Sequence, residues 1–248
     1  MGDIGNSNYN SLQITSIKRL SRGLTFNFNY TWAKSFDDTG GSRTAYNLKN
    51  EKARTQLPPH VLNFLFVYQL PFGKGKMLGK NAILDAVVGH WQLSGITTYR
   101  DGTPIGTILG ACNLPNAGNC YANYVFGFTG SPRINGAFGS GDLLGSNPPA
   151  FLDKNAFASP AAFTYGDTPR TGAYGLSNPA LYGQDLSLKR NFPIHESIAL
   201  ALQVDAINAF NIVTFAAPAL NVTSANFGKI TATANGPRSL QLSARITF

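Results

Sequence analysis

The sequence predicts an all-β fold, an antiparallel up-and-down transmembrane β-barrel segment of about seven strands. In residues 24–32, LTFNFNYTW, bulky apolar side chains alternate with amides and hydroxyls, as in a strand with two unlike faces. The connections between the predicted strands alternate between short and long, and aromatic residues gather at strand ends. Bacterial outer-membrane barrels combine these features.

The composition favours strands and turns over helices. Of 248 residues, 13% are charged and 12% aromatic, and 26 are Gly and 14 Pro. No run approaches the roughly 18 apolar residues of a membrane helix. The start, MGDIGNSNYN, has neither the basic region nor the apolar stretch of a secretory signal. For a whole protein this would predict the cytosol, and for a piece of a longer one it predicts nothing.

The formal net charge of +8 raises the question of a nucleic-acid partner. A groove that follows a phosphate backbone interleaves basic residues with exposed aromatics. Here the basic residues cluster near turns, as in residues 18–22, 74–80 and 189–190, and the aromatics lie on strands. We therefore expect no nucleic-acid partner.

Seven segments have the pattern of strands, in chain order. They are residues 9–19, 24–32, 61–70, 91–99, 184–192, 198–210 and 240–248. Each is close to the roughly 9 to 11 residues that cross a bilayer obliquely.

The connections predict two unlike ends. Tight turns, LSRG and PIHE, and the moderate link 71–90 lie at one end. Long extracellular loops near residues 33–58, 100–182 and 211–237 lie at the other. With this alternation the last strand runs toward the short turns, which predicts a periplasmic C-terminus.

The parity of the strands assigns side chains to two faces. We expect lipid to contact Leu24, Phe26, Phe28, Phe64, Phe66, Leu200, Leu202 and Leu242. We expect a watery or plugged lumen to be lined by Asn27, Asn29, Asn63, Gln69, Gln92, Arg100, Gln203, Asp205, Gln241 and Arg245. These ten suit hydroxyl-rich or peptide-like ligands, but they are also the ordinary filling of a wet lumen. Asp205 and Arg245 could form an ion pair there, or each could be solvated.

The strand ends carry two further predicted features. An aromatic girdle at the two interfaces would consist of Tyr30, Trp32, Phe72, Trp91, Tyr99 and Phe192. In the last strand, apolar residues share one face and the final residue is aromatic. We interpret this pattern as a signal for the outer-membrane assembly machinery, formed by Leu240, Leu242, Ala244, Ile246 and Phe248.

Two cysteines, Cys112 and Cys120, lie in the loop-like segment ACNLPNAGNCYAN. Since no histidines are nearby, we interpret them as a short-loop disulfide, with a reduced pair as the alternative. Seven strands cannot close alone, because single-chain bacterial barrels use even numbers from eight upward. The chain therefore looks like the C-terminal part of something larger.

The residues also carry a family resemblance. The segments YNSLQITSIKRLSRGLTFNFNYTWAKSFDD, LPFGKGK, GHWQLSGITTYRDGTPI, YGQDLSLKRNFPI, LQVDAINAFN and FGKITATANGPRSLQLSARITF occur in this order over nearly the whole chain. They resemble the last strands of Oar-like TonB-dependent outer-membrane receptors, a family abundant in Acidobacteria that bears a carboxypeptidase-regulatory-like domain. The resemblance implies a plugged barrel of about 22 strands and uptake of an unknown substrate.

The chain departs from that family in what it lacks. From residues 1–248 we expect no signal peptide, no regulatory-like domain, no TonB box and no plug domain within this part of the receptor. We therefore expect residues 1–248 to be one part of a receptor, with outer-membrane lipid and the rest of the barrel and plug, in the same or an adjacent chain, as partners. TonB would act only through the missing N-terminal part.

We expect the protein not to be an enzyme and to bind no cofactor or metal. His60, His90 and His195 lie at three separate strand ends without neighbouring ligands, and no nucleophile has an adjacent base. Asp37 and Asp38 could bind a cation, although aspartate beside glycine is common in turns. The alternative fold is a secreted or surface β-sandwich that binds glycans or mediates adhesion, because a sandwich strand alternates in the same way.

Overall fold

Seven long strands and one short strand form an eight-stranded antiparallel sheet in the computed structural model. It describes residues 5–38, 51–73, 77–78, 89–114, 120–134, 150–195 and 198–248. The long strands are β1 (Ser7–Ser21), β2 (Leu24–Asp37), β4 (His60–Gln69), β7 (Trp91–Arg100), β10 (Leu181–His195), β11 (Ile198–Ile207) and β12 (Ser239–Thr247). The short strand β3 (Ala53–Arg54) pairs with β2.

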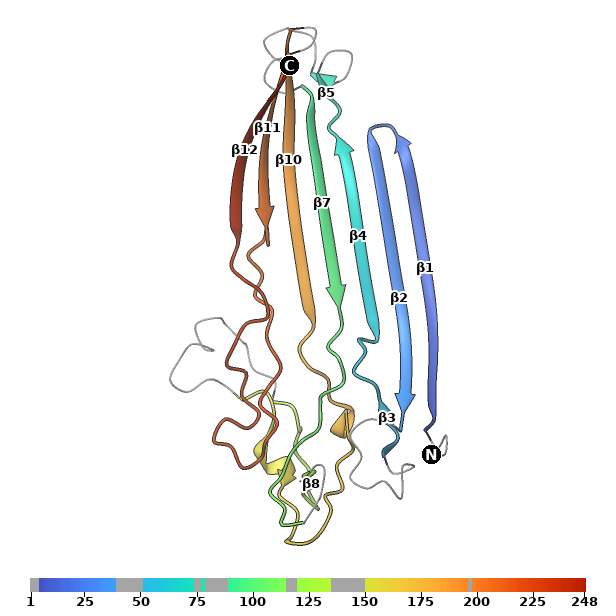
Figure 1. Ribbon diagram of the computed structural model, residues 1–248, viewed down its shortest axis with the longest axis vertical. Coiled ribbons are helices and arrows are strands. Elements are labelled where there is room, and N and C mark those ends of the chain that lie inside the picture. The colour runs from blue at the N-terminus through green and yellow to red at the C-terminus, as the bar shows by residue number, and fades with distance from the viewer. Residues whose placement is uncertain are drawn as a thin grey trace.

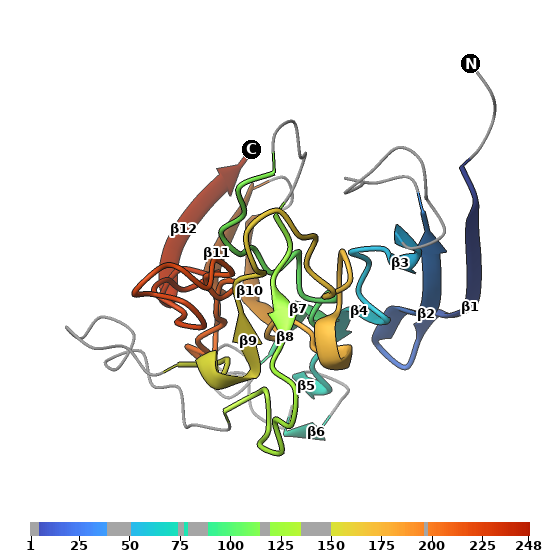
Figure 2. The same ribbon diagram turned by 90° about the horizontal axis from the view of Figure 1, so that it is seen from below.

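Each long strand pairs with the next one along the chain, so the sheet order is β1-β2-β4-β7-β10-β11-β12. This is the predicted up-and-down topology (Figure 1). The sheet curves as an arc from β12 to β1, and the barrel is not closed (Figure 2). β1 and β12 are its two edges.

The shortest connections lie at one end of the sheet and the longest lies at the other, whereas residues 70–90 at the first end and 38–59 at the second are nearly equal in length. The turn after β1 is residues 22–23, whereas β7 and β10 are joined by residues 101–180. The C-terminus lies with the short connections, and the first strand begins at the end with the long ones (Figure 1). Two-stranded pairs lie outside the main sheet: β5 (Phe72–Gly73) with β6 (Met77–Leu78), and β8 (Asn123–Tyr124) with β9 (Phe157–Ala158).

Strand boundaries are where the predictions were wrong. β2 continues to Asp37 because residues 33–37 pair with β1, so the first loop is shorter than the predicted 33–58. Arg100 and Leu181 end and begin strands that pair with each other. The third loop spans residues 208–238. Residues 39–50, 115–119 and 135–149 of the predicted loops lie outside the described part of the chain.

The pairing register carries one face across the whole sheet. Phe28 pairs with Phe64 on β4, which pairs with Thr97 on β7. Directly paired residues of an antiparallel sheet share a face. We call the side of Phe28 the apolar face, and the side of its neighbour Asn29 the polar face.

The described hydrophobic core lies in the long loops and not on the sheet. Its members come from residues 101–114, 120–134, 150–180 and 211–238, which we call the loop unit: Ile105, Ile108, Ala122, Phe151, Leu152, Ala156, Phe157, Ala173, Leu176, Val222, Phe227 and Ile230. The region predicted as irregular therefore has a packed interior.

The apolar face of the sheet is largely open. Leu242 is 79% exposed and Leu240 65%. A sandwich would bury such residues against a second sheet. The alternative of a β-sandwich is therefore wrong. No helix in the described ranges is long and apolar enough to cross a membrane.

Candidate functional site

The polar face gathers all ten residues predicted to line a lumen. Asn29 pairs with Asn63, and Gln69 pairs with Gln92 on the next strand. Asp205 pairs with Gln241 on β12. The remaining members, placed by the same registers, are Asn27, Arg100, Gln203 and Arg245. That this face borders a lumen stays a prediction, but the pairing brings these side chains onto one surface.

Hydrogen bonds link polar side chains along this face. Thr15 Oγ1 donates to Asn29 Oδ1 at 3.0 Å, and Asn29 Nδ2 donates to Asn27 Oδ1 at 2.9 Å. On β11, Gln203 Nε2 donates to both carboxylate oxygens of Asp205, at 2.8 and 3.0 Å. Neighbouring amides therefore satisfy part of one another's hydrogen-bonding capacity, and the surface stays polar and accessible.

The suggested ion pair of Asp205 with Arg245 is wrong. Asp205 lies opposite Ser187 and Gln241, whereas Arg245 pairs with Ala201. Four residues of β11 separate the two levels, at roughly 3.3 Å per residue. Asp205 is bound by Gln203 instead.

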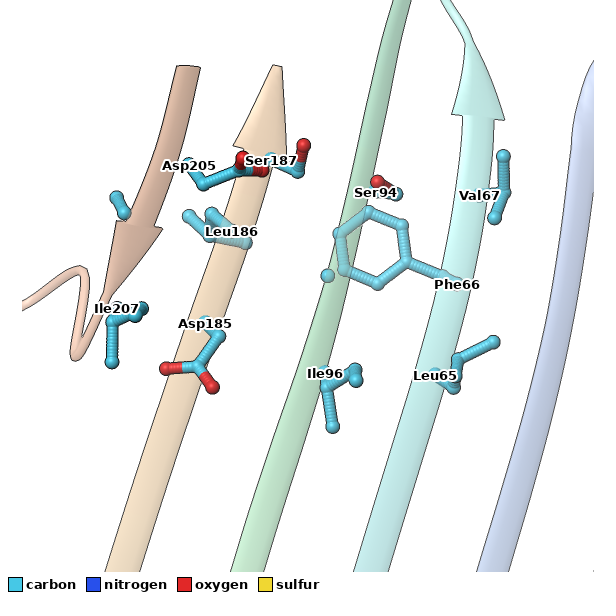
Figure 3. A pocket seen from close by; sticks show the side chains of 12 residues that line it. Leu65, Phe66, Val67, Ser94, Ile96, Asp185, Leu186, Ser187, Asp205 and Ile207 are labelled. Atoms are coloured by element: carbon cyan, nitrogen blue, oxygen red, sulfur yellow. The ribbon is translucent and has the colours of Figure 1, made fainter. Parts of the chain in front are cut away.

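An apolar patch interrupts the polar face at mid-sheet. Leu65, Ile96 and Ile207 are 45%, 47% and 51% exposed there. A cavity of about 410 Å³ covers this patch, and its other lining residues include Asp185 and Asp205 (Figure 3). Sequence reasoning missed the patch because β4 and β11 lack the strict alternation of β2.

A second cavity, of about 420 Å³, lies where the strands meet the loop unit. We call it the mouth cavity. It is lined by β3–β4 linker residues, the ends of β7 and β10, and the β11–β12 connection, including Gln56, Pro58, Arg100, Asn178, Leu181 and Phe215. Arg100 and Leu181 belong to the polar face. The mouth cavity therefore continues that face toward the long loops.

A cluster of polar side chains lies beside the mouth cavity. Tyr99 Oη donates a 2.5 Å hydrogen bond to Asp101 Oδ1. His60 Nε2 lies 3.8 Å from Asp101 Oδ2, and its Nδ1 lies 2.6 Å from Tyr30 Oη. His60 thus bridges two strands at the rim. Among the described residues, no group of three or more His, Cys, Asp or Glu has metal-site geometry.

The apolar face holds the predicted lipid contacts and most of the girdle. Tyr30, Tyr99 and Tyr182 lie at one level through successive pairing with Leu62. Trp91 and Phe192 lie toward the other end. At roughly 3.3 Å per residue and a tilt of about 40°, β10 crosses about 25 Å between Tyr182 and Phe192, the height of the apolar band in such barrels.

Two details of the girdle differ from prediction. Neither Tyr30 nor Trp32 is at the end of its strand, since β2 continues to Asp37. Arg190, which the sequence analysis grouped with the basic residues near turns, lies on the apolar face between two girdle aromatics. Its guanidinium carbon is 4.2 Å from the ring centre of Phe192 and 5.5 Å from that of Trp91. A cation at this position is stabilised by the ring faces.

An ion pair connects the loop unit to the sheet, and a disulfide links two residues within the long connection. Arg170 forms an ion pair with Asp37, and the Asn6 N–H donates to Asp38 Oδ1 at 2.6 Å. The two aspartates considered for a cation are therefore already engaged. Cys112 and Cys120 form a disulfide in the structure.

Electrostatics within the loop unit reflect its packing. Burial raises the pKa of Tyr124 above its ordinary value of 10.0. Burial, with the nearby Asp167 carboxylate, raises the pKa of Tyr174. The two rings pack edge to face, 4.4 Å apart. Both tyrosines are therefore neutral at physiological pH.

Comparison with known families agrees with this geometry. The family model described as "Outer membrane beta barrel domain" matches residues 1–241. The chain belongs to this outer-membrane β-barrel family. The searches of curated proteins and of solved structures gave no match. The protein is thus an outer-membrane barrel protein, and the sheet described above is part of its barrel wall.

Proposed function

We propose that this outer-membrane barrel protein is the C-terminal part of a TonB-dependent receptor of the Oar-like type that takes up a substrate. The resemblance of its strand segments to that family supports the proposal. The observation that carries it is the polar face, whose amides and hydroxyls lie on both sides of the apolar patch, toward the mouth cavity and toward the short connections.

Polar side chains reach the short-connection end of the polar face on five successive strands. Register places them at one level: Gln69, Gln92, Lys189, Gln203 and Ser243. Because amides and hydroxyls bind polar solutes or water, such a surface suits the wall of a transport lumen. Binding and passage, with no catalytic role, are what this arrangement supports.

The two sheet edges support a larger barrel. In hydrocarbon, unpaired backbone N–H and C=O groups are costly, so a membrane sheet must close. We propose that the rest of the barrel and the plug, in the same or an adjacent chain, pair with β1 and β12. The C-terminus would then lie in the periplasm. The outer-membrane assembly machinery would recognise the apolar residues that share one face of β12.

The test of uptake compares culture media. Cells with the gene, cells without it, and cells lacking the TonB energy-coupling protein grow in a complex medium that is followed by mass spectrometry. We expect at least one compound to be depleted only by cells that have both. Identical media from all three strains would refute the proposal.

A further inference from the structure

Arg100 places a positive charge in the mouth cavity. Arg100 is the last residue of β7 and is exposed. Within the described part of the chain, its guanidinium takes part in no hydrogen bond or ion pair. Arg190, by contrast, is buried between aromatic rings. Arg100 is therefore available to a ligand.

Asp101 also lines the mouth cavity, but its carboxylate oxygens are directed to partners other than Arg100. Successive strand residues point to opposite faces, so Asp101 follows the direction of Tyr99 and not that of Arg100. Its oxygens are directed to Tyr99 Oη at 2.5 Å and His60 Nε2 at 3.8 Å. Asp101 also donates its backbone N–H to His60 O at 2.9 Å, which holds this arrangement.

The remaining wall of the mouth cavity is largely apolar. Pro58, Pro179, Leu181 and Phe215 line it together with three alanines. Its polar lining residues besides Arg100 are Gln56, Asp101, Thr103 and Asn178. The β11–β12 connection supplies Phe215 and is itself braced, since Ala216 N–H donates to Ala232 O at 3.0 Å. The volume of about 420 Å³ lies in the range of small-molecule sites.

From these observations we propose that the mouth cavity binds an organic carboxylate with an apolar body, with Arg100 as the anchor of the carboxylate. A guanidinium can donate two parallel hydrogen bonds to one carboxylate, which selects it over a single-point acceptor. The apolar wall would contact the body of the ligand. That such carboxylates are the substrates taken up rests on the proposed uptake function.

The experiment measures binding by the full chain in detergent micelles, by saturation-transfer NMR and calorimetry. The probes are phenylacetate, 2-phenylethanol and 2-phenylethylamine, which share one ring and differ in charge. Inorganic phosphate is the competitor. The variants are Arg100→Gln, Arg100→Lys and Arg245→Gln. The last removes another cation of the polar face, near the opposite end, and serves as the matched control.

We expect phenylacetate to bind at least about tenfold more tightly than the alcohol or the amine, since a charge-assisted hydrogen bond is worth about a factor of ten or more. Arg100→Gln should weaken phenylacetate by about tenfold, Arg100→Lys should weaken it less, and Arg245→Gln should leave it unchanged. The near-ultraviolet circular dichroism of each variant reports whether it folds.

Three results would overturn the assignment. These are equal binding of the three probes, an equal loss in Arg100→Gln and Arg245→Gln, and displacement of phenylacetate by equimolar phosphate. Binding in micelles needs no energised membrane. If phenylacetate binds while cells deplete no compound, the site stands and the uptake proposal fails. If depletion occurs without binding, the reverse holds.

Discussion

Arg190 shows that a charged side chain can occupy the apolar face when it lies near one end of the sheet. It pairs with Trp91 and Leu202 on the apolar face, yet it is charged and only 5% exposed. Its depth in the sheet is that of Trp91, where the girdle would meet the headgroups. A long basic side chain can keep its charge at that depth while its stem lies against apolar neighbours.

Charged substitutions should separate the two faces of β4. Phe64→Arg should destabilise the barrel by about 2 to 4 kcal/mol, the cost of an arginine near the middle of the lipid-facing surface. Phe64 also packs against Phe66 at 5.6 Å, which adds to the loss. Its neighbour on the polar face, Asn63→Arg, is the control and should cost little. Guanidinium unfolding in lipid vesicles measures both, and equal losses would contradict the assignment of the faces.

A backbone contact makes Gly102 a second test at this scale. A Cβ there would overlap the carbonyl oxygen of Asn178, and backbone atoms cannot turn aside as a side-chain tip can. Gly102→Ala should therefore cost about 1 to 3 kcal/mol and raise hydrogen exchange around residues 101–105. Gly236→Ala, where a Cβ meets nothing within 4 Å, is the control. Unchanged exchange in Gly102→Ala would show that the two segments are not in contact.

At the scale of elements, the strands and the loop unit are stabilised by different interactions. The strands are held by ladder pairing and expose their apolar side, whereas the loop unit buries its own core. The ladder between β7 and β10 continues into the loop unit, since Ile105 N–H donates to Leu176 O at 3.0 Å. The long connections are thus an extension of the sheet with a separate core.

Removing part of that core should loosen the loop unit and leave the sheet intact. Phe157 is 4% exposed and packs against Phe227 with ring centres 5.7 Å apart. Phe157→Ala should cost about 3 to 5 kcal/mol locally and make the loop unit sensitive to protease, with strand amides still protected. Phe126, which is fully exposed in the same connection, gives the control Phe126→Ala. A loss of protection across β7 and β10 as well would mean that sheet and loop unit unfold together.

The sequence predicted the strands far better than the loop unit. Alternation at residues 24–32 and 240–248 placed the two faces, because a period of two is a local property. The loop-unit core has no such period. Ile105, Phe157 and Phe227 come from segments distant in sequence, and only the folded connections bring them together.

At the scale of the whole molecule, the sheet exposes a large apolar surface whose contact with water is unfavourable. Ile246 is 62% exposed and Leu202 40%, on an apolar face that spans every long strand. Contiguous apolar patches of this kind mark membrane or protein contacts in native proteins, and membership of the outer-membrane barrel family favours the membrane. Among the described residues, β1 and β12 also have no further strand beside them, which leaves backbone groups at two edges without ladder partners.

The chain should therefore need an amphiphile to fold. Expressed in water, we expect it to enter inclusion bodies, and to regain a strand-rich circular dichroism spectrum only in detergent or lipid. Sedimentation and circular dichroism with and without detergent measure this. A monomer that folds and stays dissolved in plain buffer would contradict the membrane assignment of the apolar face.

Local alternation and connection lengths were sufficient for the fold class and for the grouping of the ten polar residues, because side-chain direction in a strand follows from parity alone. The mouth cavity, the apolar patch near Ile96 and the pairing of Asp37 with Arg170 required the tertiary structure. They depend on which distant segments meet, and that is set by register and by the packing of the loop unit, which no local pattern encodes.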